Sequence, residues 1–180
     1  MLYSSKELLK KYGTRYNYEN AIKSKKIFKL EHGVYSDSDI VNPLILISKK
    51  YQNSIITMDS AFYYYDLTDV VPLKIHIATN RNSNPIKKDN VVQIRKPKEI
   101  LNQGVDTIII EGEQVKIYNK ERLLVELLRK RNQISFDYYK EIVSNYRKIA
   151  QELDMNKIEE YLSLYKNEVN LGNALLREVF

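Results

Sequence analysis

The chain has 180 residues, 43% of them hydrophobic and 29% charged, so it is long enough to bury a sizeable core. It has no Cys, which excludes disulfides and thiolate metal sites, and no apolar run approaches the roughly 20 residues of a membrane-spanning helix. The N-terminus lacks a signal-peptide core, so we expect a cytoplasmic protein. The formal net charge is +6, and the first 36 residues, with eight Lys or Arg against three Glu, hold five of these six charges.

Two short helices are predicted in this basic segment. Ser4 followed by Glu7 is typical of a capping box, in which each side chain binds a free backbone N–H at the start of a helix. Gly13 can adopt the left-handed conformation that ends a helix. Thr14 can then cap a second helix over about Arg15 to Ser24.

The second helix is predicted to bury one face and expose a polar one. Tyr18, Ala21 and Ile22 recur at i, i+3 and i+4, which indicates the buried face. A strand pair follows, with a turn at His32 and Gly33 that favours a small DNA-binding wing. Arg and Asn can bind base edges, and Lys and Tyr can hold phosphates. An ordinary solvated face is the alternative to our prediction that DNA is contacted by Arg15, Tyr16, Asn17, Asn20, Lys23, Lys25, Lys26 and Lys29.

The rest of the chain is predicted to form a second domain. A polar segment precedes Pro43, which suits the first turn of a helix, so we expect a winged-helix-like domain over residues 1–38 and a second domain over residues 43–180. Strands are expected near residues 55–57, 74–79, 91–95, 107–110 and 114–118, with Asp59 capping a helix and three or four helices at the end. The expected fold class is α+β: a small N-terminal winged helix-turn-helix followed by a mixed α/β domain with C-terminal helices.

Three segments of the chain resemble one family. The run from Leu9 to Asp37 resembles the N-terminal domain of AbiEi-type antitoxins, which belong to type IV toxin-antitoxin (abortive infection) systems. Residues 55–69, IITMDSAFYYYDLTD, resemble the family's SAL-x-x-x-x-LTD segment, and residues 115–128, VKIYNKERLLVELL, resemble its VKVYDKERTLCDLL segment. The positions that match family motifs are Gly33, Tyr35, Ser60, Leu67, Thr68 and Arg122.

This resemblance implies a phage-defence antitoxin that also acts as a DNA-binding transcriptional autorepressor. The implied partners are double-stranded DNA at inverted repeats of its own operator and a cognate nucleotidyltransferase-like toxin, generally without a tight antitoxin-toxin complex. No membrane partner is implied. An antitoxin that contacts its toxin directly and binds little DNA remains an alternative.

The sequence predicts neither an enzyme nor a cofactor. The five Gly residues form no phosphate-cradling loop, and neither His32 nor His76 has an obvious relay partner. A Mg²⁺-dependent nuclease built from Asp106, Glu113 and Lys116 is a further alternative. However, the Glu-x-x-Lys spacing places the last two side chains on opposite faces of a strand, so we expect no metal site.

Overall fold

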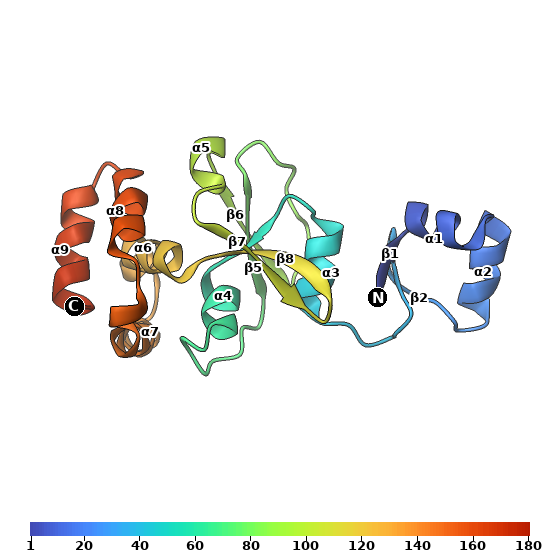
Figure 1. Cartoon of the computed structure of the whole chain (residues 1–180), viewed down its shortest axis with the longest axis horizontal. Helices are drawn as coiled ribbons and strands as arrows, with labels where there is room; N and C mark the ends of the chain where they lie inside the picture. The colour runs from blue at the N-terminus through green and yellow to red at the C-terminus, as the bar shows by residue number, and fades with distance from the viewer. The chain divides into compact units, whose positions relative to one another are not determined.

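The computed structural model describes all 180 residues and contains nine α-helices and eight strands (Figure 1). The chain forms two compact units. Unit 1 comprises Met1–Asn53 and Ile108–Val115, and unit 2 comprises Ser54–Thr107 and Lys116–Phe180. The predicted α+β class is therefore confirmed.

Unit 1 contains three helices and a small antiparallel sheet. Strand β1 (Leu2–Ser4) is followed by α1 (Ser5–Tyr12) and α2 (Arg15–Lys23). Strands β2 (Phe28–Glu31) and β3 (Val34–Ser36) form a hairpin, and α3 (Pro43–Lys50) comes after it. The strand order is β1-β3-β2. A winged helix is not confirmed, because only two helices precede the hairpin and β1 adds a third strand to it.

The ends of the first two helices are formed by the predicted residues. Ser4 and Glu7 make the complete capping box, with each side chain accepting a hydrogen bond from the other residue's backbone N–H. Gly13 has φ of 78° at the end of α1, and the Thr14 side chain accepts a hydrogen bond from the Asn17 backbone at the start of α2. Local sequence signals are sufficient to define these two helices.

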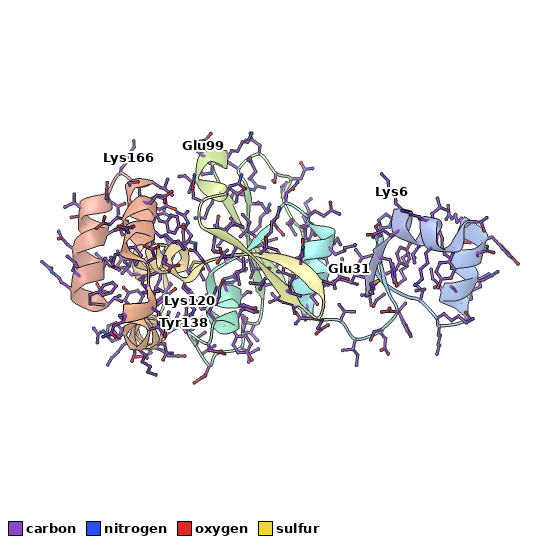
Figure 2. The ribbon with its side chains drawn as sticks, viewed as in Figure 1. Lys6, Glu31, Glu99, Lys120, Tyr138 and Lys166 are labelled. Atoms are coloured by element: carbon purple, nitrogen blue, oxygen red, sulfur yellow. The ribbon has the colours of Figure 1, made fainter.

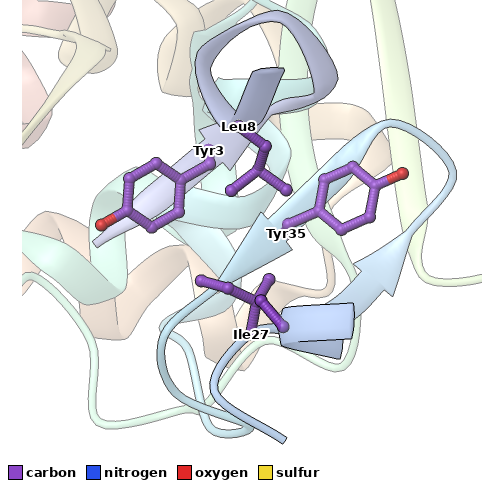
Figure 3. Close-up of a cluster of buried hydrophobic side chains, with 5 residues drawn as sticks. Tyr3, Leu8, Ile27 and Tyr35 are labelled. Carbon is purple, nitrogen blue, oxygen red and sulfur yellow. The ribbon is translucent and has the colours of Figure 1, made fainter. Parts of the chain in front are cut away.

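A compact apolar cluster holds unit 1 together. The cluster contains the buried side chains of Tyr3, Leu8, Ile27 and Tyr35, which come from β1, α1, the segment before β2, and β3 (Figure 3). Ala21 completes the cluster from α2, where the predicted partners of its apolar face are partly buried against it. The buried face of α2 is thus the predicted one.

Unit 2 is built on a mixed sheet. Its first elements are β4 (Ile55–Ile56), α4 (Met58–Tyr64), β5 (Ile75–Asn80), β6 (Val91–Lys96) and α5 (Lys98–Leu101). Strands β7 (Val105–Ile110) and β8 (Glu113–Tyr118) complete the five-stranded order β6-β5-β4-β8-β7. Strand β4 pairs antiparallel with β5 and parallel with β8, while β5 and β6 are parallel.

Four helices complete unit 2. They are α6 (Lys120–Lys130), α7 (Phe136–Lys148), α8 (Met155–Ser163) and α9 (Glu168–Glu178), and α6, α8 and α9 lie together in Figure 1. Every residue of α6 from Arg122 to Leu128 is buried, so this helix is the centre of the helical layer. None of the helices is both long enough and apolar enough to span a membrane.

One predicted helix start is wrong by two residues. Helix α4 begins at Met58 with Thr57 in the N-cap position, and Asp59 lies in its first turn instead of capping it. Met58 has φ of 44°, a left-handed conformation that is unusual for a residue with a side chain. The strand β4 therefore passes almost directly into α4, and Asp59 becomes available to a neighbouring cavity.

Candidate functional site

Unit 2 contains a cavity of about 310 Å³, which is at the lower end of the range for small-molecule sites. Strands β5 and β6, the start of α4, the end of α6 and the start of α7 surround it. Its apolar lining is Met58, Val92, Ile94 and Ile134, and its polar lining is Asp59, His76, Lys130, Gln133, Ser135 and Tyr138. An apolar wall with several convergent polar groups is typical of a ligand site.

Two hydrogen bonds that the His76 backbone makes hold β5 to the start of α4. The Thr57 N–H donates to the His76 carbonyl at 3.0 Å, and the His76 N–H donates to Ser60 Oγ at 2.9 Å. His76 is thereby fixed opposite the first turn of α4, which carries Asp59. The alternation of β5 buries the residues on either side of His76 and directs its imidazole toward the other face.

His76 and Asp59 form a loose acid-base pair. His76 Nδ1 lies 3.7 Å from Asp59 Oδ2, which is too long for a hydrogen bond, and Nδ1 is buried without any hydrogen-bond partner. Burial lowers the pKa of His76, and nearby Lys130 lowers it further against the opposing effect of Asp59. A neutral imidazole beside a carboxylate can accept a proton from a bound hydroxyl group.

The other side of the cavity favours anions. Lys130 supplies a cation at the end of α6, and the buried Tyr138 hydroxyl lies near Thr68 and Asp59 but makes no hydrogen bond of good geometry. Burial raises the pKa of Tyr138, so its hydroxyl stays protonated and can donate. Tyr138, labelled in Figure 2, belongs to the first turns of α7, and no side chain caps the N-terminus of that helix. Its free backbone N–H groups add partial positive charge.

We expect the lowered pKa of His76 to make folding stability depend on pH. Because the folded state disfavours protonation of His76, its contribution is complete above the ordinary pKa of about 6.5 and is lost as pH falls through the lower folded value. Urea unfolding at pH 7.5 and pH 5 should therefore show a loss of stability that is smaller in His76→Gln. An equal loss in both proteins would contradict the assignment.

A second polar cluster is buried between α6 and β6. The Glu126 carboxylate contacts Lys96 Nζ at 2.7 Å, Arg122 Nη2 at 2.9 Å and Arg129 Nη1 at 3.0 Å. It also accepts a hydrogen bond from the Tyr165 hydroxyl at 2.7 Å. We call these five side chains the Glu126 network. The Glu126 carboxylate oxygens are already bound by these four donors. We therefore interpret the network as a structural link between the sheet and the helices.

Arg122 is completely buried within a cage of tyrosine rings. Its guanidinium carbon lies 5.4 Å, 5.9 Å and 5.3 Å from the ring centroids of Tyr118, Tyr161 and Tyr165. These distances fit cation-π contacts, which stabilise a charge that water cannot reach. Gly104 packs directly on Arg122, because a Cβ added there would lie 2.7 Å from the arginine Cβ. Arg122 therefore has a structural role.

The residues predicted to contact DNA all lie in unit 1. The Arg15 guanidinium is paired with Glu19 at 2.7 Å, and the Asn17 amide donates to the Tyr12 carbonyl, so both groups have partners within the helices. Lys25 has a left-handed φ of 55°. All the residues of the predicted set are exposed: Arg15, Tyr16, Asn17, Asn20, Lys23, Lys25, Lys26 and Lys29. Their exposure agrees with the prediction, whereas a role in binding stays a prediction.

The alternative nuclease residues do not form a metal site. Asp106 is in β7, Glu113 and Lys116 are in β8, and Glu113 accepts a hydrogen bond from the Leu2 backbone. No group of three His, Cys, Asp or Glu side chains in the chain is placed to hold a metal ion. The cavity residues were missed for a different reason, since His76 and Asp59 each fitted a purely structural interpretation.

The comparisons with known proteins decide the family. Residues 65–177 match the family model described as "Nucleotidyl transferase of unknown function (DUF2204)". The match covers more than half of the chain. The chain belongs to the DUF2204 family. All polar residues of the cavity except Asp59 lie inside the matched region, among them His76, Lys130 and Tyr138.

One solved structure supports the fold. It is the crystal structure of the RV2827C protein from Mycobacterium tuberculosis, with a TM-score of 0.71 and 13% sequence identity. The alignment covers 99% of this chain and 72% of that one. At this identity the likeness concerns the fold alone. No curated protein matches the chain.

The family match corrects three expectations. The DUF2204 domain takes the place of the AbiEi-type antitoxin family, whose motifs were each built from common residues. The expected function as an antitoxin and DNA-binding autorepressor, or alternatively as a nuclease, is wrong on the same ground. The expectation that the chain is not an enzyme is also wrong, because the family is described as a nucleotidyl transferase.

The residues present do not fit the metal centre that nucleotidyl transfer ordinarily uses. Such centres hold divalent ions with carboxylates that clamp the reacting phosphate. Asp59 is the only carboxylate that lines the cavity, and Glu126 is already surrounded by cations. We therefore derive no step through a metal ion.

Proposed function

We propose that unit 2 of this DUF2204 protein binds a nucleotide in the cavity between β5, β6 and the start of α7. The observation that carries the proposal is that a cation, a carboxylate and two buried polar atoms that make no hydrogen bond of good geometry, His76 Nδ1 and the Tyr138 hydroxyl, converge on one small cavity. Buried polar groups in folded proteins are normally hydrogen-bonded, so two orphaned atoms in one cavity favour a polar ligand. The family description supports the choice of a nucleotide.

Each polar group has a defined part in this proposal. Lys130 and the free N–H groups of α7 neutralise the phosphate, while the Tyr138 hydroxyl donates a hydrogen bond to it. Val92 and Ile94 form the apolar wall against which a base or sugar packs. Neutral His76 accepts the proton of a hydroxyl group brought next to the phosphate, and Asp59 steadies the resulting imidazolium.

We expect Lys130→Gln to weaken nucleotide binding by about tenfold, because a hydrogen bond to a charged partner contributes about 1.5 kcal/mol. Isothermal titration calorimetry with ATP, GTP, CTP and UTP measures the affinities. Lys140→Gln is the matched control, since Lys140 is exposed on α7 and does not line the cavity. Equal affinities for wild type and Lys130→Gln would remove this cavity from the proposal.

A further inference from the structure

This inference rests on the proposed function and concerns how the phosphate charge is neutralised. We propose that the cavity holds the nucleotide without a divalent metal ion, with the Lys130 ammonium group in the place that a metal would otherwise take. The side chains that this chain supplies do not match the metal centre that the family description suggests.

The acidic groups near the cavity are too few for the two-ion centre of nucleotidyl transfer. Mg²⁺ is usually held by one or two carboxylates together with phosphate oxygens, and the two-ion centres of nucleotidyl transfer need more. Asp59 belongs to no group of three acidic or His side chains that could hold a metal ion, and its neighbours in the cavity are His76, at 3.7 Å, and the Tyr138 hydroxyl. A neutral imidazole with a buried, unpaired Nδ1 is a ligand for softer metals and a poor one for Mg²⁺.

The neighbouring carboxylate on α6 is not free to help. Glu126 lies one helical turn before Lys130, and its two oxygens are shared among Lys96, Arg122, Arg129 and Tyr165. Burial raises the pKa of Glu126, but the three cations lower it by more than burial raises it, so the pKa falls to about 2. Recruiting Glu126 as a metal ligand would place another cation beside three existing ones, which is unfavourable in a buried site.

The cavity already contains what a phosphate needs. Lys130 brings a full positive charge, Tyr138 brings a protonated hydroxyl, and the uncapped start of the 13-residue helix α7 brings backbone N–H groups. These are the groups that bind phosphates directly in proteins. The single negative group, Asp59, then repels the ligand slightly instead of anchoring it through a metal.

The sign of the Asp59 effect separates the two arrangements. If a metal ion bridged Asp59 and the phosphate, Asp59→Asn would remove a ligand and weaken ATP binding at least tenfold. In the arrangement without metal, the same change removes a like charge, so we expect ATP to bind about two- to fivefold more tightly. Asp66→Asn is the control, because Asp66 is exposed outside the cavity and Asn tolerates its left-handed φ of 56°.

The experiment is calorimetric titration of ATP into wild type, Asp59→Asn and Asp66→Asn, once in EDTA and once in Mg²⁺. We expect wild-type affinity in EDTA to equal or exceed that in Mg²⁺, since free ATP carries more negative charge for Lys130. A tenfold loss in EDTA, or a tenfold loss in Asp59→Asn, would overturn the inference. The same outcomes would leave nucleotide binding itself intact.

A titration of Mn²⁺ alone, followed by electron paramagnetic resonance, makes the test independent of the nucleotide. We expect no stoichiometric binding to wild type. Stoichiometric Mn²⁺ binding that Asp59→Asn abolishes would overturn the inference even if ATP did not bind. Absence of ATP binding in both buffers would instead refute the proposed function, and the inference would fall with it.

Discussion

Replacement of Glu126 by Gln is expected to lower the free energy of unfolding by about 3 to 5 kcal/mol, because removing one partner of a buried ionic cluster leaves uncompensated charge. Three cations would remain beside a neutral amide that accepts only one or two of their hydrogen bonds. Urea denaturation at pH 7 measures the loss. Glu160→Gln, an exposed change on α8, should alter stability by no more than about 0.5 kcal/mol.

The same network predicts how acid affects the protein. Burial raises the pKa of Glu126, but Lys96, Arg122 and Arg129 together hold it at about 2, below its ordinary value of 4.5. Its contribution to stability is therefore complete above pH 4.5 and is lost as pH falls toward 2. The Gln variant should lose less stability over this interval than wild type.

If Glu126→Gln lowered the free energy of unfolding by less than about 1 kcal/mol at pH 7, the network would contribute no more than an exposed ion pair does.

Gly104→Ala is expected to destabilise unit 2 by about 2 to 4 kcal/mol through two separate effects. Gly104 has φ of 71°, where a side chain costs about 1 to 2 kcal/mol. The new Cβ would also lie 2.7 Å from the Arg122 Cβ and 3.0 Å from the Tyr161 ring, which adds an overpacking penalty of about 1 to 3 kcal/mol.

Gly112→Ala separates these two effects. Gly112 has a similar φ of 82°, but no atom lies within 4 Å of the position that its Cβ would take. The difference between the two variants in thermal or urea unfolding therefore isolates the contact with Arg122. If both variants lost the same stability, the close packing of Gly104 on the arginine would carry no energetic weight.

The local parts of the fold could be predicted from short stretches of sequence. Ser4, Glu7, Gly13 and Thr14 act within a few residues of themselves, so their capping roles are visible without any tertiary information. The strands β5, β6, β7 and β8 also lie close to their predicted ranges, because alternation and turn residues depend only on neighbours. The order of these strands in the sheet depends on distant pairings and was not predicted.

The candidate site could not be predicted because its residues are distant in sequence. Asp59, His76, Lys130 and Tyr138 come from four different elements, and each one fits a structural interpretation by itself. Lys96 and Glu126 likewise meet only through the packing of β6 on α6. The functional prediction was placed on the basic N-terminal segment, because its charges are close together in the sequence and can be recognised without a structure. The family prediction was wrong because it depended on short motifs built from common residues.

The two-residue strand β4 has a consequence for how the protein folds. It occupies the middle of the sheet, yet its parallel partner is Ile117, far along the chain from Ile56. During synthesis, the edge of β4 that receives β8 stays open until that strand has left the ribosome. Long-range pairings of this kind slow folding, because the chain between them must lose its freedom before the contact forms. Assembly of the sheet is thus timed by the arrival of β8.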